Sequence, residues 1–474
     1  MVLSCRKTFL LNRIAAIAAV MLALVLTSFA QGKNPVILVP GLSGSELLHK
    51  GTMKRVWFRV TKSKSEDLRL PVMADPSKMH DDLIPGDVLR KVKIGIFPVT
   101  DIYGGFIKAM EERGGYHEEK WDSPSEKGYQ DSLYVFPYDW RLDIVQNSKL
   151  LIQRIDRLRK TLKKPDLKFD IVAHSMGGII SRYAAMYGDA DLPAHNAKPQ
   201  PTWAGSRYFN KVILLGTPNE GSTLSLDVFV NGFTIGGFKI DLPFLQDVSK
   251  FATFTIPAAY QLLPAPGTMR VYNDKLEPVA IDIYDPKTWS RYGWNVMNDK
   301  RFAQHFSAAE RKAAPAYFAA VLNRAKRLHE ALAAVGSNTG NVTFYQVGSD
   351  CKTALDSIVV YEDKKENKWK TLFKPKGFSR ADGQKVSDED LKKVMLRPGD
   401  GIVTRRSLDA ETLSDKLGLP SVFIKANENY ICEDHNKLAA NSQIQDYVIS
   451  ILTGTATPAK EKGVAAASKK QEIK

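Results

Sequence analysis

Short, mostly apolar runs recur along the chain, separated by stretches in which apolar residues return every three or four positions. In the first half of the chain these runs are Val36–Val39, Leu133–Phe136, Phe169–Ala173 and Val212–Leu215. A run of this kind predicts a strand that is buried on both faces. Residues 145–162 show the helical spacing between two of them. Strands that alternate with helices in this way indicate an α/β fold, with a mostly parallel sheet and helices on both faces.

The alternation stops after Pro218 and resumes further along the chain. Residues 219–305 are rich in glycine, proline and aromatic residues, which predicts a cap inserted into the α/β domain rather than a second domain of its own. A helix at 308–335 and a strand at 342–347 then restore the pattern. A charged, hairpin-like stretch follows at 352–398.

The end of the chain predicts a last strand at Ser421–Ile424 and a last helix at Lys437–Leu452, before an Ala/Lys-rich tail that we expect to be disordered. The expected organisation is a leader at 1–30, a first half of the α/β core at 31–218, a cap or lid at 219–305, a second half of the core at 306–453 and a tail at 454–474.

The first thirty residues have the pattern of a targeting segment. Three basic residues precede an apolar run at 14–26, and the small residues Ser28 and Ala30 follow it. Because a bilayer span needs roughly 20 apolar residues, this run favours a cleaved signal peptide over an uncleaved membrane anchor. The sequence therefore predicts an exported protein, either periplasmic or secreted.

Charge and cysteine content refine this picture. Lys and Arg outnumber Asp and Glu by 67 to 52 in the 474-residue chain, a net charge of +15, and removal of the three leader charges would leave +12. This excess favours an anionic partner such as a phospholipid surface.

After cleavage only Cys351 and Cys432 remain, and export would permit one disulfide between them. Two buried free thiols are the alternative.

The segment Ala173-His174-Ser175-Met176-Gly177 follows a predicted strand and opens a predicted helix. This pattern is a nucleophile elbow of the G-x-S-x-G type with alanine at the first position. The elbow is a strained strand-to-helix turn, so small residues must flank the nucleophile two positions away on either side. We therefore predict Ser175 as a catalytic nucleophile.

A nucleophilic serine needs a base, and an acid that orients the base, in the chain order serine, acid, histidine. Four histidines follow the serine: His195, His305, His329 and His435. Of these, His435 lies between the last predicted strand and helix, where an α/β hydrolase places its base. Asp350, directly after a strand, and Asp400, between two glycines, both remain candidates for the acid on this reasoning.

An oxyanion hole needs two backbone N–H groups, one from the residue after the nucleophile and one from a loop after an early strand. Met176 supplies the first, and Leu42, directly after Val39-Pro40-Gly41, is the candidate for the second.

Several further segments carry a family pattern. They are residues 35–45 (Pro-Val-Ile-Leu-Val-Pro-Gly-Leu-Ser-Gly-Ser), 137–141 (Pro-Tyr-Asp-Trp-Arg), 173–178 (Ala-His-Ser-Met-Gly-Gly), 257–264 (Pro-Ala-Ala-Tyr-Gln-Leu-Leu-Pro) and 399–403 (Gly-Asp-Gly-Ile-Val). Together they resemble the lecithin:cholesterol acyltransferase (LCAT) family of α/β hydrolases, which includes lysosomal phospholipase A2. The resemblance implies a triad of Ser175, Asp400 and His435, with Leu42 and Met176 at the oxyanion positions.

The chain departs from the family pattern in two places. Ile402 stands where the family's acid motif usually has threonine, and no cysteine lies between Lys50 and Asp87 to close a lid loop. Asp139 and Trp140 have no catalytic role that we can derive, and we expect them in a buried structural network.

The resemblance implies a lipid acyl-ester enzyme that works through an acyl-enzyme, as an O-acyltransferase, a phospholipase A or both. Phospholipid at a peripheral membrane surface is the expected substrate, with no cofactor, no metal and no nucleic-acid partner. The alternatives are a soluble carboxylesterase or neutral lipase, and a catalytically inactive envelope binding protein. The cap aromatics Phe229, Phe233, Phe238 and Phe244 are expected either to gate lipid entry or to pack as an ordinary core.

Overall fold

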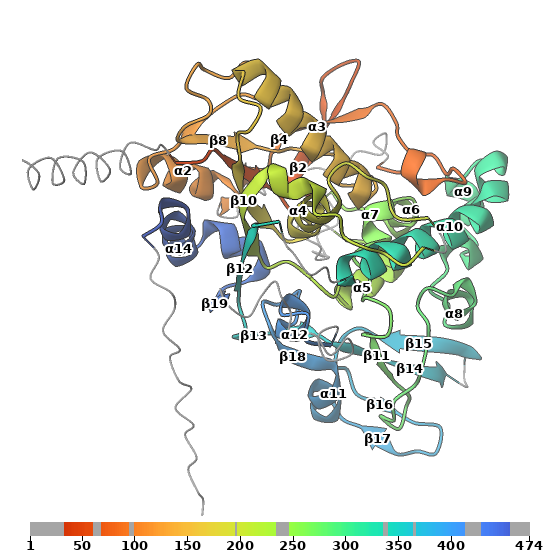
Figure 1. Cartoon of the computed structure of the whole chain (residues 1–474). Helices are drawn as coiled ribbons and strands as arrows, with labels where there is room; N and C mark the ends of the chain where they lie inside the picture. The colour runs from red at the N-terminus through yellow and green to blue at the C-terminus, as the bar shows by residue number, and fades with distance from the viewer. Residues whose placement is uncertain are drawn as a thin grey trace, which may run out of the picture.

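A parallel sheet forms the centre of the computed structural model (Figure 1). All its adjacent strands pair in parallel, in the order β19-β12-β10-β9-β1-β8-β7. The expected α/β-hydrolase fold is thereby confirmed. The strands are β1 (Val36–Val39), β7 (His117–Glu118), β8 (Ser132–Val135), β9 (Phe169–His174), β10 (Phe209–Leu215), β12 (Thr343–Gly348) and β19 (Glu428–Tyr430). The structure describes residues 33–59, 68–93, 99–194, 197–233, 246–334, 340–363, 366–412 and 428–455.

The apolar strands bury both faces of this sheet because successive side chains point to opposite sides. In β1, Ile37 and Val39 belong to one hydrophobic cluster, whereas Val36 and Leu38 belong to another. All four side chains are inaccessible to solvent. A short continuous apolar run is therefore the sequence signature of a strand with helices on both sides.

Helices cover the two faces as two separate layers (Figure 1). Each layer packs into one of the two hydrophobic clusters that contain the side chains of β1. Leu151 and Ile180 belong to the cluster on one side of the sheet, and Phe106 and Val448 belong to the cluster on the other side. The first layer contains α3 (Ile144–Leu162), α4 (Met176–Tyr187) and α10 (Ala308–Ala333), and the second contains α2 (Gly104–Glu112), the 3-10 helix η5 (His435–Ala440) and α14 (Ser442–Thr453).

The helix starts follow local capping chemistry. The side chain of Asp143 accepts a hydrogen bond from the Gln146 N–H at the start of α3. Ser307 and Glu310 form a capping box at the start of α10. The single helix expected at 437–452 is in fact two, because the Asn441 side chain caps a new helix, α14, directly after η5.

The segment between β10 and α10, which we call the cap region, consists of short helices and one short strand. Its elements are α5 (Leu224–Asn231), α6 (Lys250–Phe254), α7 (Pro257–Tyr260), β11 (Arg270–Tyr272), α8 (Pro286–Arg291), η4 (Val296–Asn298) and α9 (Phe302–His305). Phe229 packs against Tyr260 and Trp289, and Phe233 contacts Trp140 edge-on. Because Phe229 and Phe233 are almost completely buried, they form an ordinary core; Phe238 and Phe244 lie outside the described residues.

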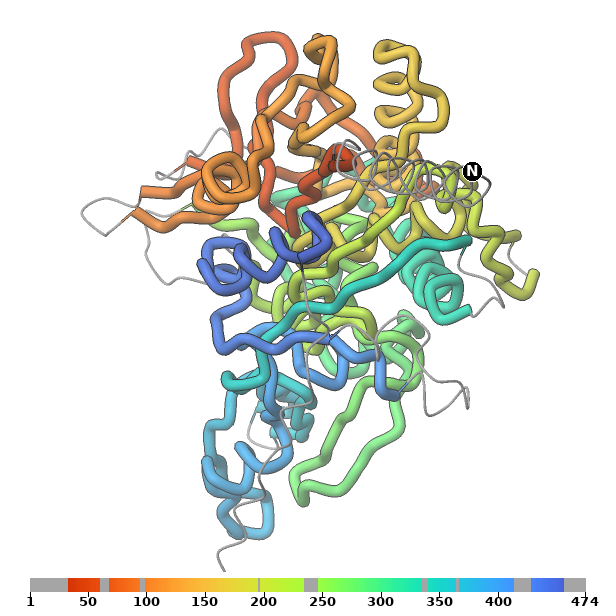
Figure 2. Tube along the Cα trace, turned by 60° about the vertical axis from the view of Figure 1, so that its left-hand side comes forward, coloured from red at the N-terminus to blue at the C-terminus, as the bar shows by residue number. Residues whose placement is uncertain are grey.

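Residues 352–399 form small sheets at one end of the molecule (Figures 1 and 2). The expected hairpin is present, with β14 and β15 antiparallel. In addition, β14 pairs in parallel with β11 of the cap region, so these two distant segments share a sheet. The elements are β13 (Lys352–Leu355), β14 (Ser357–Asp363), β15 (Lys368–Leu372), β16 (Phe378–Ser379), β17 (Lys385–Val386), α11 (Asp388–Met395) and β18 (Leu396–Gly399).

The segment after β1 lies against the core through a buried ion pair. Arg141 is fully buried and binds the carboxylates of Asp81 and Asp139 at 2.7 Å each. The Pro-Tyr-Asp-Trp-Arg segment thus has the buried structural network that we expected. The remaining elements are β2 (Ser45–His49), β3 (Arg55–Trp57), η1 (Pro76–Lys78), β4 (Leu83–Val88), β5 (Lys91–Val92), β6 (Thr100–Asp101), η2 (Ala204–Arg207) and α12 (Arg405–Leu408).

Three expectations fall outside the described residues: the leader at 1–30, the strand at Ser421–Ile424 and almost all of the tail at 454–474. Within the described part of the chain, no helix has both the length and the apolar character needed to cross a bilayer.

Candidate active site

Ser175 lies on the sharp turn between β9 and α4. Its backbone has φ of 54° and ψ of −123°, a strained conformation that a side-chain-bearing residue rarely adopts. The turn passes so close to the first strand that a Cβ on Gly177 would lie 2.5 Å from the Pro40 carbonyl oxygen. The small residue expected at this position is therefore a steric requirement, and the turn presents the serine above the carboxyl end of the sheet.

A serine, a histidine and an aspartate from three distant segments meet at this point. The Nε2 atom of His435 lies 2.9 Å from the Oγ atom of Ser175. Its Nδ1 atom lies 2.7 Å from the Oδ2 atom of Asp400. Asp400 and His435 are 1% and 3% exposed, so both side chains are shielded from solvent. The structure thus brings together the three residues that the family resemblance placed in the triad.

The loop around Asp400 fixes the direction of its carboxylate. Oδ1 accepts hydrogen bonds from the N–H groups of Ile402 and Val403, at 3.0 and 2.7 Å. The N–H group of His435 donates to the Asp400 carbonyl oxygen at 2.9 Å. Oδ2 therefore points at the imidazole. The competing candidate, Asp350, instead forms a surface ion pair with Arg405 at 2.7 Å.

The other histidines that follow the serine in the chain lie elsewhere. His305 stacks on Phe251 with ring centroids 3.9 Å apart. His329 is buried within α10, and burial lowers its pKa to about 4. His195 lies outside the described residues.

Both expected oxyanion residues flank the serine. Met176 is the first residue of α4, so its N–H group has no acceptor within the helix. Leu42 lines the cavity that contains Ser175. The neighbouring Gly41 uses its N–H group for a 2.8 Å hydrogen bond to the hydroxyl of Tyr103, so Leu42 stays the candidate donor in this loop.

The cavity above Ser175 is apolar. The cavity has a volume of about 540 Å³, which includes the solvent-filled space at its opening. Within the described ranges, its wall contains no Asp, Glu, Lys or Arg side chain. The wall consists of Gly41, Leu42, His174, Ser175, Pro218, Ser222, Leu224, Ser225, Val228, Leu262, Ile402, Val403, His435 and Asn436.

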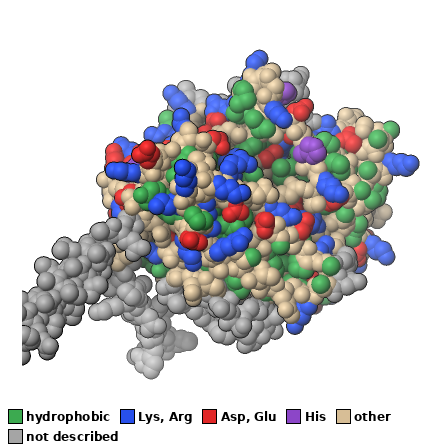
Figure 3. Space-filling view, turned by 45° about the horizontal axis from the view of Figure 1, so that its top comes forward, with side chains coloured by type: hydrophobic (Ala, Val, Ile, Leu, Met, Phe, Trp, Pro, Cys, Tyr) green, Lys and Arg blue, Asp and Glu red, His purple; other side chains and the backbone are tan. Residues whose placement is uncertain are grey.

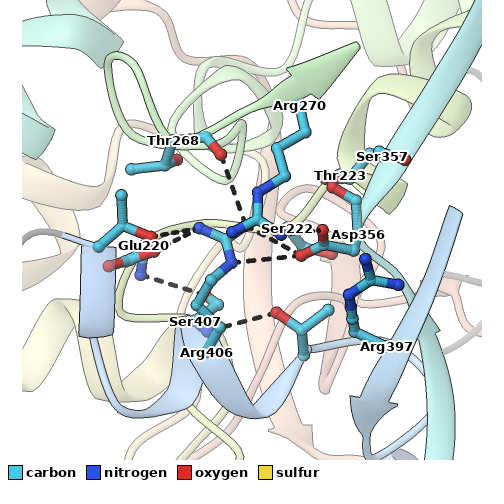
Figure 4. Close-up of polar contacts among 12 residues, drawn as sticks. Glu220, Ser222, Thr223, Thr268, Arg270, Asp356, Ser357, Arg397, Arg406 and Ser407 are labelled. Atoms are coloured by element: carbon cyan, nitrogen blue, oxygen red, sulfur yellow. Dashed lines mark hydrogen bonds and ion pairs between the residues drawn. The ribbon is translucent and has the colours of Figure 1, made fainter. Parts of the chain in front are cut away.

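An ionic cluster connects the acid loop to the cap region (Figure 4). Arg406 in α12 binds Glu220 at 3.0 Å and Asp356 at 3.0 Å. It also donates to the Thr268 carbonyl oxygen at 3.4 Å, and Arg270 of β11 pairs with the second oxygen of Asp356 at 3.3 Å. The Arg406 guanidinium therefore links three segments close to the Asp400 loop. It contacts the loop after β10 through Glu220, the cap region through Thr268, and the small sheets of residues 352–399 through Asp356.

The base loop has a covalent anchor as well. Cys351 and Cys432 form a disulfide across 81 residues of sequence, which is the first of the two alternatives for this pair. The bond connects the loop after β12 to the loop that carries His435. In the part of the chain covered by the structure, no group of three His, Cys, Asp or Glu side chains is arranged to hold a metal ion.

His174, directly before the nucleophile, makes contacts that the sequence did not reveal. Its Nδ1 atom lies 2.8 Å from the Tyr103 hydroxyl, and its Nε2 atom lies 3.0 Å from the His435 carbonyl oxygen. Burial, and secondarily the nearby His435, lower the pKa of His174 to about 3. The only sequence signal was a histidine inside the serine motif, while Tyr103 carried none.

Comparison with one solved structure supports the fold, and two others are similar over most of their length. The crystal structure of the Tle4–Tli4 complex has a TM-score of 0.53 and 14% identity, with 89% of this chain and 98% of that chain covered. Bacillus licheniformis lipase BlEst2 in its mature form matches over 89% and 92% of the two chains (TM-score 0.33, 14% identity). EstA from Clostridium botulinum matches over 89% and 87% (TM-score 0.33, 14% identity). Fold and site together define an α/β hydrolase.

Sequence comparison finds one family model that matches part of the chain. Residues 110–306, which include β8, the serine turn and the cap region, match the family described as Lecithin:cholesterol acyltransferase. This match covers less than half of the chain, and it agrees with the resemblance to the LCAT family of α/β hydrolases in the sequence. No curated protein matches the sequence.

Proposed function

We propose that this protein is a serine-dependent lipid acyl-ester enzyme that works through a covalent acyl-enzyme. The observation that carries the proposal is the unbroken chain of contacts from Ser175 Oγ through the His435 ring to Asp400, at 2.9 and 2.7 Å, at the floor of an apolar cavity. The match of residues 110–306 to the LCAT family model supports acyl-ester chemistry at this site.

The geometry supports the following steps. Ser175 Oγ attacks the ester carbonyl carbon while His435 Nε2 takes the hydroxyl proton, and the Nδ1–H group donates to Asp400. The N–H groups of Leu42 and Met176 stabilise the oxyanion. The leaving alkoxide takes the proton from Nε2, which leaves the acyl group on the serine. Water or an alcohol then attacks the acyl-enzyme with the same base.

We propose a lipid ester as the substrate, with phospholipid as the preferred acyl donor. The apolar wall suits an acyl chain, and the described part of that wall offers no cation to a phosphate group. A headgroup would therefore lie outside the cavity. On the face shown in Figure 3, Lys and Arg are interspersed with Asp and Glu, so the proposal relies on the cavity rather than on a basic patch.

We also propose that the protein is exported after cleavage of the leader. The basic start and apolar run of residues 1–30 support this. The Cys351–Cys432 disulfide supports it independently, because such bonds persist in oxidising compartments. Cell fractionation with N-terminal sequencing of the mature chain would test it, and a cytosolic protein that retains Met1 would refute it.

The decisive experiment is incubation of the purified mature chain with acyl-labelled phospholipid, with and without a long-chain alcohol. Free labelled fatty acid in both reactions would identify a phospholipase, and a labelled ester with the alcohol would identify an acyltransferase. Activity confined to short soluble esters would instead identify a carboxylesterase.

The first prediction assigns this activity to the proposed nucleophile. Ser175→Ala should reduce ester cleavage by about 10³-fold or more, because the covalent route is lost. Labelling by a fluorophosphonate probe should disappear in the same variant. Unchanged labelling would place the nucleophile elsewhere, and no activity or labelling in the wild-type chain would favour an inactive binding protein.

A further inference from the structure

Beneath the proposed triad, three loops are joined by one chain of hydrogen bonds. The N–H group of Gly41 lies 2.8 Å from the hydroxyl oxygen of Tyr103. That oxygen lies 2.8 Å from Nδ1 of His174, whose Nε2 lies 3.0 Å from the carbonyl oxygen of His435. Tyr103 and His174 are both buried, so water cannot easily replace either bond.

Only one placement of hydrogens satisfies every atom in this chain. The Gly41 N–H can only donate and the His435 carbonyl can only accept. His174 must therefore carry its proton on Nε2, and its Nδ1 must accept the hydroxyl proton of Tyr103. Burial keeps the imidazole neutral because it lowers the pKa of His174 to about 3. The chain thus runs in one direction, from Gly41 to His435.

Each end of this chain adjoins a residue of the proposed machinery. Gly41 precedes the oxyanion residue Leu42, His174 precedes the nucleophile Ser175, and the last acceptor belongs to His435 itself. The three hydrogen bonds, Gly41–Tyr103, Tyr103–His174 and His174–His435, span 62, 71 and 261 residues of sequence. The three parts of the site therefore share one set of buried contacts.

We propose that Tyr103 and His174 are positioning residues that fix the oxyanion loop, the serine turn and the base loop relative to one another. Their hydrogen bonds go to Gly41, to each other and to the His435 carbonyl oxygen, and not to the Ser175 hydroxyl, the His435 ring or the Asp400 carboxylate. Their effect comes through alignment, because a displacement of about 1 Å at a reacting group can reduce a rate roughly 10²-fold. This inference rests on the proposed serine-ester function.

The test compares two tyrosine-to-phenylalanine variants with a short soluble ester as the substrate. Tyr103→Phe keeps the ring and removes the hydroxyl that links Gly41 to His174. Tyr134→Phe is the matched control, because its hydroxyl is also buried and donates to the Gly128 carbonyl oxygen at 2.6 Å, outside the site. We expect Tyr103→Phe to lower kcat by about 10- to 100-fold, with KM within about twofold and a loss of thermal stability similar to that of the control.

A second variant keeps the inference testable if the first does not fold. His174→Gln retains an N–H donor for the His435 carbonyl but loses the ring nitrogen that accepts from Tyr103. It should lower kcat in the same way, and adding Tyr103→Phe should cause little further loss, because both changes break one chain. Additive losses of kcat, or a Tyr103→Phe variant whose kcat equals that of Tyr134→Phe, would overturn the inference. A wild-type chain that cleaves no ester would overturn the proposed function instead.

Discussion

The serine side and the acid–base side of the site are built in different ways. Ser175 lies between β9 and α4, which are consecutive in sequence, and its strained backbone is fixed by close packing against the first strand. Asp400 and His435 come from loops after β18 and β19, outside the regular strand–helix alternation. Those loops are held by the guanidinium of Arg406, by the Cys351–Cys432 disulfide and by their own backbone hydrogen bonds.

This difference separates what local sequence determines from what distant contacts determine. The serine turn forms from small residues at a junction between a consecutive strand and helix, and its one distant support in our proposal is the contact of His174 with Tyr103. The acid and base loops need partners such as Glu220 and Cys351, which are far away in the chain. We therefore expect the acid–base side to be the more sensitive to substitutions remote from the catalytic atoms.

The largest expected effect on the acid–base side concerns the choice between two aspartates. Asp400→Asn should reduce kcat by about 10³- to 10⁴-fold, because an amide in place of the carboxylate favours the wrong imidazole tautomer. Asp350→Asn removes only an exposed ion pair with Arg405 and should change kcat by less than about threefold. Steady-state kinetics on a soluble ester measure both, and a reversed order would assign the acid to Asp350.

The same contrast explains how much of the molecule the sequence predicts. The strand expected at Val36–Val39 is observed with those bounds, because a run buried on both faces has a clear apolar signal. β7 (His117–Glu118) escaped notice because a two-residue polar strand at the sheet edge has none. The parallel pairing of β11 with β14 was also unpredictable, since nothing local encodes contacts between segments this far apart.

In the site, local sequence identified Ser175 because its motif is contiguous. The acid could not be chosen from the residues alone, since Asp350 directly follows a predicted strand and Asp400 lies between two glycines. Asp400 was favoured by family resemblance, and the structure now places its carboxylate 2.7 Å from His435. Tyr103 could not be found at all, because its contact with His174 spans 71 residues and belongs to no motif.

The disulfide should be the strongest of the distant supports. Replacing Cys351 and Cys432 together by alanine releases a loop of 81 residues in the unfolded chain and should cost about 4 kcal/mol of unfolding free energy. Urea denaturation measures the loss, and thiol titration of the unreduced wild-type chain provides the control. A wild-type chain with two free thiols would contradict the expected bond.

The ionic cluster should contribute somewhat less. Arg406→Gln leaves the buried carboxylates of Glu220 and Asp356 without their shared partner and should cost about 3 kcal/mol. The matched control is Arg113→Gln, which removes an exposed pair with Asp446 and should cost less than about 1 kcal/mol. Equal losses in the two variants would show that the cluster is no more important than a surface ion pair.

The smallest expected effect at neutral pH comes from a buried histidine remote from the catalytic atoms. His329 in α10 has a pKa lowered to about 4 by burial, against about 6.5 in the unfolded chain. Between these values the unfolded state binds a proton that the folded state does not, so stability should fall as the pH drops from about 6.5 towards 4. One histidine contributes a slope on the order of 1.4 kcal/mol per pH unit, and His329→Gln should remove that part of the slope.

Unfolding free energies measured between about pH 6.5 and 4 test this prediction, with the substitution His49→Gln at an exposed histidine as the control. Parallel curves for wild type and His329→Gln would show that the buried ring does not cause the acid sensitivity.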